Sequence, residues 1–334
     1  MTIPYRLGFA VKVLGGGGLA GADARRWQSK PHLSRSLELL DVLFDYLDGA
    51  DLRMYRLSSG VVPYGTHPDL PELDYRRQIG ECAEALAALG AKARTYGLRL
   101  STHPGQYTVI NGPDPELVAK ASLDLEQDAL LLEALGAGPE AVVVVHVGGV
   151  YGDRASALER WVRAYERLSE PARGRIAVEH DETSFTVADV LELHRRTGVK
   201  VIYDHHHHRC NVAPGYEDFR AALAAAYATW PADVRPKVHL SSPRTELRLV
   251  ERKRLGRRGK ETKLVPPLLD QHSDFVPPWD FAALVRAAPG PVDVMLEAKA
   301  KDLALLWLRQ QLERVEPEIA AGEERRAPSA AAVA

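Results

Sequence analysis

The chain has 334 residues, of which 46% are hydrophobic, and its formal net charge is −2 at pH 7. This length can hold one large α/β domain or two smaller ones, with enough apolar residues for a substantial core. The near-zero charge gives no general attraction to nucleic acids or membranes, so DNA binding would require a local basic segment. The only cysteines, Cys82 and Cys210, are too few for a disulfide scaffold and are typical of a reducing cytoplasm.

The N-terminal residues MTIPYR lead into a short strand pattern without a signal segment. No apolar run approaches the roughly 20 residues that a membrane-spanning helix needs. We therefore expect a soluble cytoplasmic protein that does not bind membranes.

The first half of the chain alternates short β-branched runs with longer helical patterns. The expected strands are residues 5–13, 52–57 and 98–102, and the expected helices are residues 32–47, 74–96 and 115–135. The glycine run at 15–18 lacks the spacing of a phosphate-binding motif and predicts a plain loop. Such an alternation is typical of repeated βα units around a parallel sheet.

The second half repeats this rhythm, with expected strands at residues 141–145, 175–179, 199–203, 236–240 and 292–296. Helical patterns cover residues 155–168, 186–196, 216–227 and 302–314. Eight βα units in a chain of this length predict a single (β/α)8 TIM barrel over residues 1–316. Residues 317–334 are rich in Ala, Glu and Arg without an apolar stripe, which predicts a disordered tail.

Metal-competent side chains stand at the ends of six expected strands. In barrels of this kind the active site lies where the strands end and the βα loops begin. A single histidine or glutamate there could equally be a core residue or a helix cap, but six from six are hard to obtain by chance. The six residues are His103, His146, Glu179, Asp204, His239 and Glu297.

Three histidines, two glutamates and one aspartate without cysteine favour a borderline or hard divalent ion such as Zn²⁺ or Mn²⁺. Carboxylates can bridge two ions about 3.5–4 Å apart, the arrangement used to cleave phosphodiesters. His207 follows Asp204 by three residues, and with His272 it could hold a further ion. Lys237 lies two residues before His239 and shares its face of the strand, as a charge partner or as part of the site.

Seven segments, in this order and spacing, resemble the UV damage endonuclease family, DNA repair nucleases with a (β/α)8 fold related to endonuclease IV. The resemblance extends from about residue 5 to residue 314, with the metal cluster at the C-terminal ends of the strands. The segments are LSTHPGQYTVIN, VVHVGGVYGD, VEHDETSF, DHHHHRCN, PKVHLSSPR, HSDFV and VMLEAKAKD.

The resemblance implies cleavage of the DNA backbone immediately 5′ to a bulky lesion, leaving a 3′-hydroxyl and a 5′-phosphate, with multi-metal catalysis and no ATP. Up to three divalent ions are implied, Mn²⁺ first, with Zn²⁺, Co²⁺ or Mg²⁺ as alternatives. His103 and His146 with Glu179 and Glu297 would hold one ion, Asp204 and His239 with the same glutamates a second, and His207 with His272 a third. Lys237, which can be carboxylated in the family, would join Glu179, Glu297 and His239 in catalysis.

The resemblance also implies DNA contacts. Gln106 and Tyr107 would enter the duplex opposite the lesion, although a plain turn is the alternative from the residues alone. Phe9, where a tyrosine is frequent, would contact the lesion near Val13, and His67 would lie near the metal cluster. His180, where asparagine is common, and Asp181 would orient the ligands.

A basic segment, VERKRLGRRGKETKL, follows the seventh expected strand. As a loop on the barrel rim it would grip phosphates of damaged double-stranded DNA; a solvated run of charge is the alternative. We expect no obligate protein partner and a monomer. The basic residues are Arg252, Lys253, Arg254, Arg257, Arg258, Lys260 and Lys263.

Other functions remain open at this point. An endonuclease IV-like enzyme specific for abasic sites would share the metal chemistry and differ only in its wedge and lesion pocket. A metal-dependent sugar isomerase would use the same ligand types, but it would not need a wedge or a basic segment. A lesion-binding protein without cleavage is disfavoured by the complete ligand set.

Overall fold

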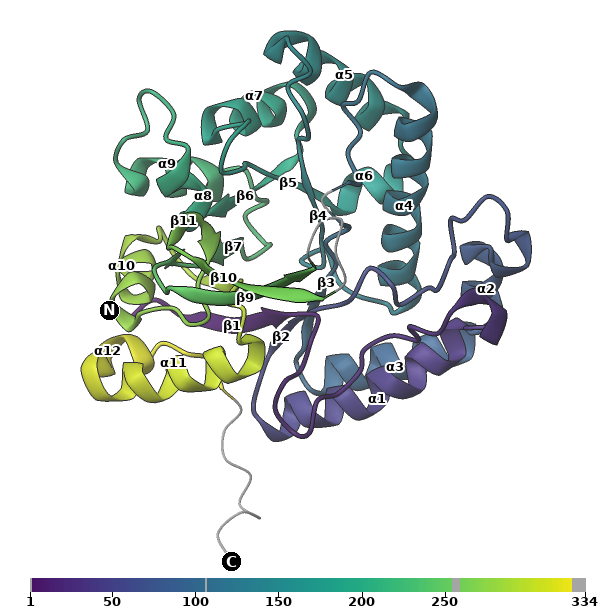
Figure 1. Cartoon of the computed structure of the whole chain (residues 1–334), viewed down its shortest axis with the longest axis horizontal. Coiled ribbons are helices and arrows are strands. Elements are labelled where there is room, and N and C mark those ends of the chain that lie inside the picture. The colour runs from purple at the N-terminus through teal and green to yellow at the C-terminus, as the bar shows by residue number, and fades with distance from the viewer. Residues whose placement is uncertain (1, 106, 254–258, 326–334) are drawn as a thin grey trace, which may run out of the picture.

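The computed structural model describes residues 2–105, 107–253 and 259–325. At its centre lies one sheet of eight parallel strands in the order β3-β2-β1-β12-β7-β6-β5-β4, surrounded by helices (Figure 1). The strands are β1 (Tyr5–Ala10), β2 (Met54–Arg56), β3 (Arg99–Ser101), β4 (Val143–His146), β5 (Ile176–Glu179), β6 (Lys200–Asp204), β7 (Lys237–Leu240) and β12 (Val292–Leu296).

The sheet closes on itself between β3 and β4, the two strands at the ends of that order. Thr102 forms a parallel bridge with Val143. The Thr102 amide donates to the carbonyl of Val142 at 3.1 Å, and the Val144 amide donates to the carbonyl of Thr102 at 3.0 Å. These bonds make the sheet a barrel, so the predicted (β/α)8 fold is confirmed.

The outer helices follow the expected pattern with two differences. The helix expected at 74–96 is divided at Cys82, and the one expected at 216–227 begins at Phe219, after the Asp218 side chain caps its first turn. None of the helices in the described ranges has the length and apolar character to cross a membrane. The helices are α1 (Leu33–Gly49), α2 (Tyr75–Glu81), α3 (Ala83–Thr95), α4 (Pro115–Ala134), α5 (Arg154–Arg167), α6 (Glu170–Arg175), α7 (Val187–Thr197), α8 (His205–Cys210), α9 (Phe219–Tyr227), α10 (Pro278–Ala287), α11 (Lys301–Val315) and α12 (Pro317–Ala320), with 3-10 turns η1 (Trp27–Ser29) and η2 (Pro71–Leu73).

The barrel strands are buried on both faces, as expected for parallel strands under helices. Val143 and Val145 belong to the large core shared with the helices, whereas Val142 and Val144 pack in a second cluster with Trp230. The opposite end of the barrel from the candidate ligands contains buried ion pairs, because Asp293 accepts from Arg6 and Arg99. This rigid frame fixes where each strand ends.

The prediction of a disordered tail is wrong for residues 317–325. Residues Pro317–Ala320 form α12, Ile319 is buried, and Glu323 pairs with Arg309 and bridges to Tyr5 beside β1. Composition alone missed these anchors because one apolar residue and one ion pair are enough to dock a short helix. Residues 326–334 lie outside the described part of the chain.

The basic segment is not the loop that we expected. It forms an antiparallel hairpin of β9 (Arg248–Lys253) and β10 (Lys260–Val265), followed by β11 (Leu268–His272) pairing with β8 (Pro243–Arg244) (Figure 1). Leu249 and Leu264 lie directly opposite each other, a cross-strand pair of the kind that stabilises a ribbon. Arg254, Arg257 and Arg258 lie outside the described residues, and only the backbone of Arg252 and Lys253 is described.

Candidate metal centre

The six expected ligands converge at one end of the barrel. His146, Glu179 and Asp204 are the last residues of β4, β5 and β6, and His239 lies within β7. His103 and Glu297 follow β3 and β12 closely. The strand register pairs His146 with Glu179 and Asp204 with His239, so neighbouring strands deliver their polar ends at the same height.

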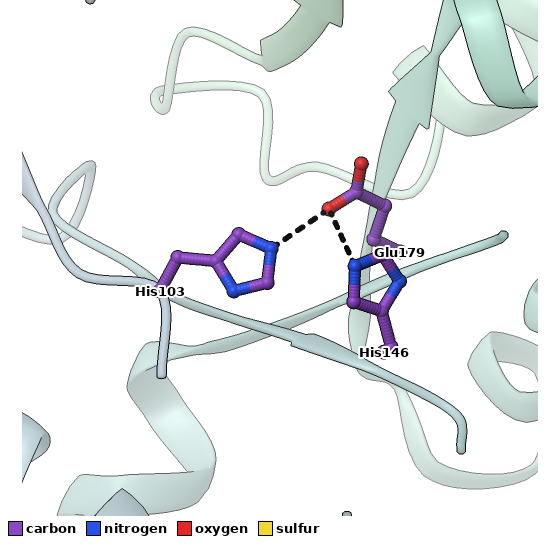
Figure 2. A group of neighbouring side chains, drawn as sticks. All are labelled: His103, His146 and Glu179. Atoms are coloured by element: carbon purple, nitrogen blue, oxygen red, sulfur yellow. Dashed lines mark ion pairs between the residues drawn. The ribbon is translucent and has the colours of Figure 1, made fainter. Parts of the chain in front are cut away.

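Glu179 joins the first group of metal-competent side chains. Its Oε2 lies 3.3 Å from His103 Nε2 and 3.9 Å from His146 Nε2 (Figure 2). One ligand atom from each of the three residues lies within 4.8 Å of the others. Two imidazole nitrogens and one carboxylate oxygen at this spacing can hold one divalent ion.

Glu179 also belongs to the second group, with Asp204, His239 and Glu297. The other oxygen, Oε1, lies 2.9 Å from His239 Nδ1, and that nitrogen is 3.3 Å from Glu297 Oε1. Glu179 therefore faces one group with each of its oxygens. A carboxylate in this position can bridge two ions.

Three histidines have Nδ1 within hydrogen-bond distance of a backbone carbonyl. The partners are Pro104 for His103, His180 for His207 and Glu297 for His272, each at 3.0 Å. In such a bond Nδ1 carries the proton, so Nε2 presents a free lone pair. Hydrogen bonds of this kind commonly orient metal-binding imidazoles.

The centre is a buried concentration of negative charge. Burial raises the pKa of Glu179, but His239, His146 and other neighbouring histidines outweigh it and hold that pKa well below its usual range. Three atoms here are buried and have no hydrogen-bond partner: Glu179 Oε2, Asp204 Oδ2 and His239 Nε2. Buried orphaned acceptors are costly, and a divalent cation would satisfy them, so the donor set fits the expected metal.

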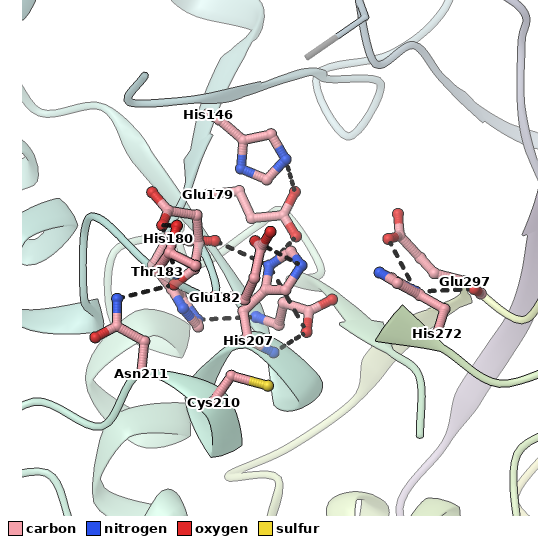
Figure 3. Close-up of polar contacts among 12 residues, drawn as sticks. His146, Glu179, His180, Glu182, Thr183, His207, Cys210, Asn211, His272 and Glu297 are labelled. Carbon is pink, nitrogen blue, oxygen red and sulfur yellow. Dashed lines mark hydrogen bonds and ion pairs between the residues drawn. The ribbon is translucent and has the colours of Figure 1, made fainter. Parts of the chain in front are cut away.

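His207 and His272 lie beside these groups, with ring centres 5.9 Å apart (Figure 3). His207 Nδ1 is 3.4 Å from Glu179 Oε1, and its Nε2 is 3.7 Å from Glu182. Burial lowers the pKa of His207, but Asp204 and Glu179 raise it well above its usual range. Sequence reasoning missed Glu182, whose only signal was its place three residues after Glu179. The helical turn needed to bring His207 back to Asp204 is α8.

Lys237 is fully buried beside the centre, and its Nζ donates to Ser101 Oγ at 3.0 Å. Burial, together with the nearby charges of Arg56 and Arg99, lowers the pKa of Lys237 well below its ordinary value. Sequence reasoning also missed Arg56, which ends β2 and forms a close ion pair with Glu297. Its signal was a cation at a strand end, where we searched only for ligands.

His180 and Asp181, both expected to orient ligands, behave differently. His180 is buried, and its Nε2 accepts the backbone amide of Asp204 at 3.1 Å; burial lowers its pKa to about 3. Asp181 accepts the amides of Thr183, Ser184 and Phe185. His180 therefore supports a ligand directly, whereas Asp181 organises the loop after β5.

The expected DNA contacts are divided between exposed and buried residues. Tyr107 is 87% exposed, but Phe9 is fully buried against Tyr55, so the prediction that Phe9 contacts the lesion is wrong. His67 is exposed beside Tyr64, and among the described residues neither metal-competent group includes it. Gln106 lies outside the described residues, and Lys260 is exposed and pairs with Glu251.

A cleft of about 840 Å³ opens from the centre toward solvent. It lies among the loops that follow β3, β4 and β5. His146, His207 and Glu297 line its inner part, and Tyr107 and Tyr151 are exposed side chains of its wall. Such a volume is typical of a substrate-binding site.

Fold and site together define a TIM barrel with a metal-competent cluster at the C-terminal ends of its strands. The model of one family, UV-endonuclease UvdE, matches residues 33–323. The chain therefore belongs to the UV-endonuclease UvdE family.

Two relatives and two solved structures illustrate this membership. The UV DNA damage endonuclease of Bacillus cereus strain B4264 is 30% identical over 284 residues, covering 85% of this chain and 82% of the relative. That of Bacillus thuringiensis subsp. konkukian is 29% identical over 288 residues, covering 86% and 82%. SacUVDE matches with a TM-score of 0.75 at 23% identity (93% and 98% covered), and endonuclease IV from Thermus thermophilus with 0.55 at 18% (92% and 99% covered); both show a common fold.

Proposed function

We propose that this chain is a DNA repair endonuclease that recognises UV photoproducts and other helix-distorting lesions. It would cut the phosphodiester immediately 5′ to the lesion and leave a 3′-hydroxyl and a 5′-phosphate. The observation that carries the proposal is Glu179, which faces two adjoining metal-competent groups in a member of the UV-endonuclease family.

The ligand roles follow from these positions. His103 and His146 would hold one divalent ion with Glu179, and Asp204, His239 and Glu297 a second with the same glutamate. His207 and His272 would help to hold a third. Mn²⁺ is the first candidate, with Zn²⁺, Co²⁺ or Mg²⁺ as alternatives. Ions bound there would activate water and neutralise charge that develops on the phosphate.

The chain's own charges would support this reaction. Arg56 holds Glu297 in place through its ion pair. Lys237, whose lowered pKa favours the neutral amine, is poised for the carboxylation that the family resemblance implies. No protein nucleophile is required by this arrangement.

The partner would be damaged double-stranded DNA. Tyr107, with Gln106 beside it in the chain, would insert between bases, because a planar aromatic can replace lost stacking. An extruded lesion costs less energy than an extruded normal pair, which would provide part of the selectivity. We further propose a cytoplasmic monomer without an obligate protein partner.

The test is single-turnover incision with Mn²⁺ of end-labelled duplexes that contain one pyrimidine dimer, one abasic site or no lesion. The wild type and the exposed control Glu318→Gln on α12 should cut directly 5′ to the dimer. Glu179→Gln should be slower by more than about 100-fold, the upper loss for a residue that only supports a ligand. Chelation should abolish cutting, and added Mn²⁺ should restore it.

The outcomes separate the alternatives. Cutting of the abasic duplex alone would keep the metal chemistry but replace the lesion assignment with an endonuclease IV-like one. No cutting of any duplex would refute the proposal and leave a sugar isomerase, for which the D-psicose 3-epimerase of Clostridium cellulolyticum H10 (TM-score 0.50, 13% identity, 95% and 96% covered) offers a similar fold.

A further inference from the structure

Tyr151 occupies a turn that does not suit an aromatic residue. It lies between β4 and α5, where the Asp153 amide donates to the carbonyl of Val150 at 3.3 Å. Both central residues have positive φ, 51° for Tyr151 and 83° for Gly152. Turns of this kind favour glycine, asparagine or aspartate, so the tyrosine is strained. Strain in a bulky residue at a candidate site points to a role outside the turn itself.

The ring of Tyr151 rests on a fixed support. The guanidinium carbon of Arg160, on α5, lies 5.5 Å from the ring centre. Arg160 Nε donates to the carbonyl of Asn111 at 2.7 Å, and Asn111 Nδ2 donates to that of Gly149 at 2.8 Å. A methyl group on Gly149 would come within 3.0 Å of the ring. The loops after β3 and β4 are thus tied together beneath Tyr151.

The other side of this ring is open. Tyr151 is 50% exposed and lines the same cleft as Tyr107, whose inner part is formed by His146, His207 and Glu297. An arginine beneath an aromatic ring, with solvent above it, leaves one planar surface available to a ligand.

The charges of the cleft indicate what kind of ligand fits. Apart from the candidate ligand groups, the charged residues that line it are Asp114, Lys120, Asp124, Asp181 and Glu182. Four carboxylates against one lysine disfavour a phosphate away from the metals. A planar, uncharged nucleobase meets no such repulsion, and stacking on an aromatic ring is a common way to bind one.

We propose that Tyr151 is a stacking platform for a nucleobase that has left the duplex next to the incision site. This inference rests on the proposed endonuclease function and adds a base-binding subsite to it. Tyr151 and Tyr107 would contact DNA from neighbouring loops, with Arg160 keeping the Tyr151 ring in position. The strain of the turn is retained because asparagine or glycine could not stack.

The test compares Tyr151→Phe, which keeps the ring, with Tyr151→Asn, which removes the ring and suits the turn. Tyr227→Asn, on α9 at the opposite end of the barrel, is the control. Fluorescent 2-aminopurine is placed one position at a time around a pyrimidine dimer in both strands. Binding and fluorescence are measured with Ca²⁺ in place of Mn²⁺ to hold back cleavage, and incision with Mn²⁺.

We expect the wild type, Tyr151→Phe and Tyr227→Asn to quench 2-aminopurine at one or more positions. Tyr151→Asn should lose that quenching and bind the duplex about tenfold to a hundredfold more weakly, as for the loss of one stacked base. Its melting temperature should equal or exceed that of the wild type, because asparagine tolerates positive φ.

Tyr151→Asn with unchanged quenching and affinity would overturn the inference alone, provided that the wild type incises the dimer duplex. Weaker binding accompanied by a lower melting temperature would also overturn it, since the residue would then serve the fold. A wild type that neither binds nor incises the dimer duplex would refute the proposed function, and the inference with it.

Discussion

The metal centre and the β9–β10 hairpin both concentrate charge on the same barrel, yet they are built in opposite ways. Glu179, Asp204 and His239 are fully buried, and barrel strands fix their positions. On the hairpin, by contrast, Lys260 is exposed and Leu249 and Leu264 are 72% and 55% exposed. Burial strengthens every electrostatic interaction in the centre, whereas water and salt screen those of the hairpin.

This difference teaches which charges have large effects. The exposed Lys260–Glu251 pair is worth at most about 1 kcal/mol. Side chains in the buried centre shift one another's pKa strongly, as the lowered pKa of Glu179 and the raised pKa of His207 show. Changes at buried charged groups should therefore exceed changes on the hairpin.

The largest of these effects is expected at Asp128 on α4, a buried carboxyl outside the metal centre. Burial raises its pKa to about 7, from 3.8 in the unfolded chain. The folded state thus retains a proton that the unfolded state loses, so the free energy of unfolding should fall as the pH rises from about 4 to 7. Each pH unit costs about 1.4 kcal/mol.

Asp128→Asn should remove this dependence. Urea unfolding at pH 5 and pH 8 should show the variant gaining about 3 kcal/mol on the wild type between the two values. The exposed control Asp69→Asn should stay parallel to the wild type. An equal change with pH in Asp128→Asn and wild type would show that the carboxyl ionises normally despite its burial.

An intermediate effect is expected at His180, which supports Asp204 through a backbone hydrogen bond. His180→Ala should weaken Mn²⁺ binding about 10- to 100-fold, as removal of such support commonly does. His180→Asn can still accept the amide and should stay within a few-fold of the wild type. Calorimetric titration of Mn²⁺ measures both, and equal affinities in the two variants would contradict a supporting role for the histidine.

The smallest effect is expected on the hairpin. Replacing Lys260 and Lys263 with glutamine should weaken duplex binding a few-fold. It should also reduce the slope of log affinity against log salt by about 1 for each phosphate that the hairpin no longer neutralises. Binding measured between about 50 and 200 mM salt tests this, with Arg195→Gln on α7 as the control. An unchanged slope would mean that the hairpin is only a solvated run of charge.

The sequence was sufficient to predict the barrel and the ligands of its centre. Unbroken apolar runs mark parallel strands that are buried on both faces, and each run stops at a residue that can bind a metal. Because the ends of barrel strands converge on one face, the order of the chain already implied that His103, His146 and Glu179 would meet. The rule needs no knowledge of the exact register.

Other features depended on packing between distant parts of the chain. Phe9 lies on a strand whose two faces are both buried, so no alternation of polar and apolar residues could reveal its exposure. Arg56 and Glu297 are 241 positions apart and meet only because β1 separates their strands in the closed barrel.

The hairpin and the final helix were mispredicted for the same physical reason. Charge and composition report what a segment's side chains prefer, but they do not report which partner is within reach. For the hairpin, the Leu249–Leu264 pair formed across the ribbon. For the final helix, Arg309 and Tyr5 were already in place to hold Glu323. The sequence alone determined the barrel and its ligand set, because both follow from local patterns; the neighbours of each ligand arise from packing, which only the tertiary structure decided.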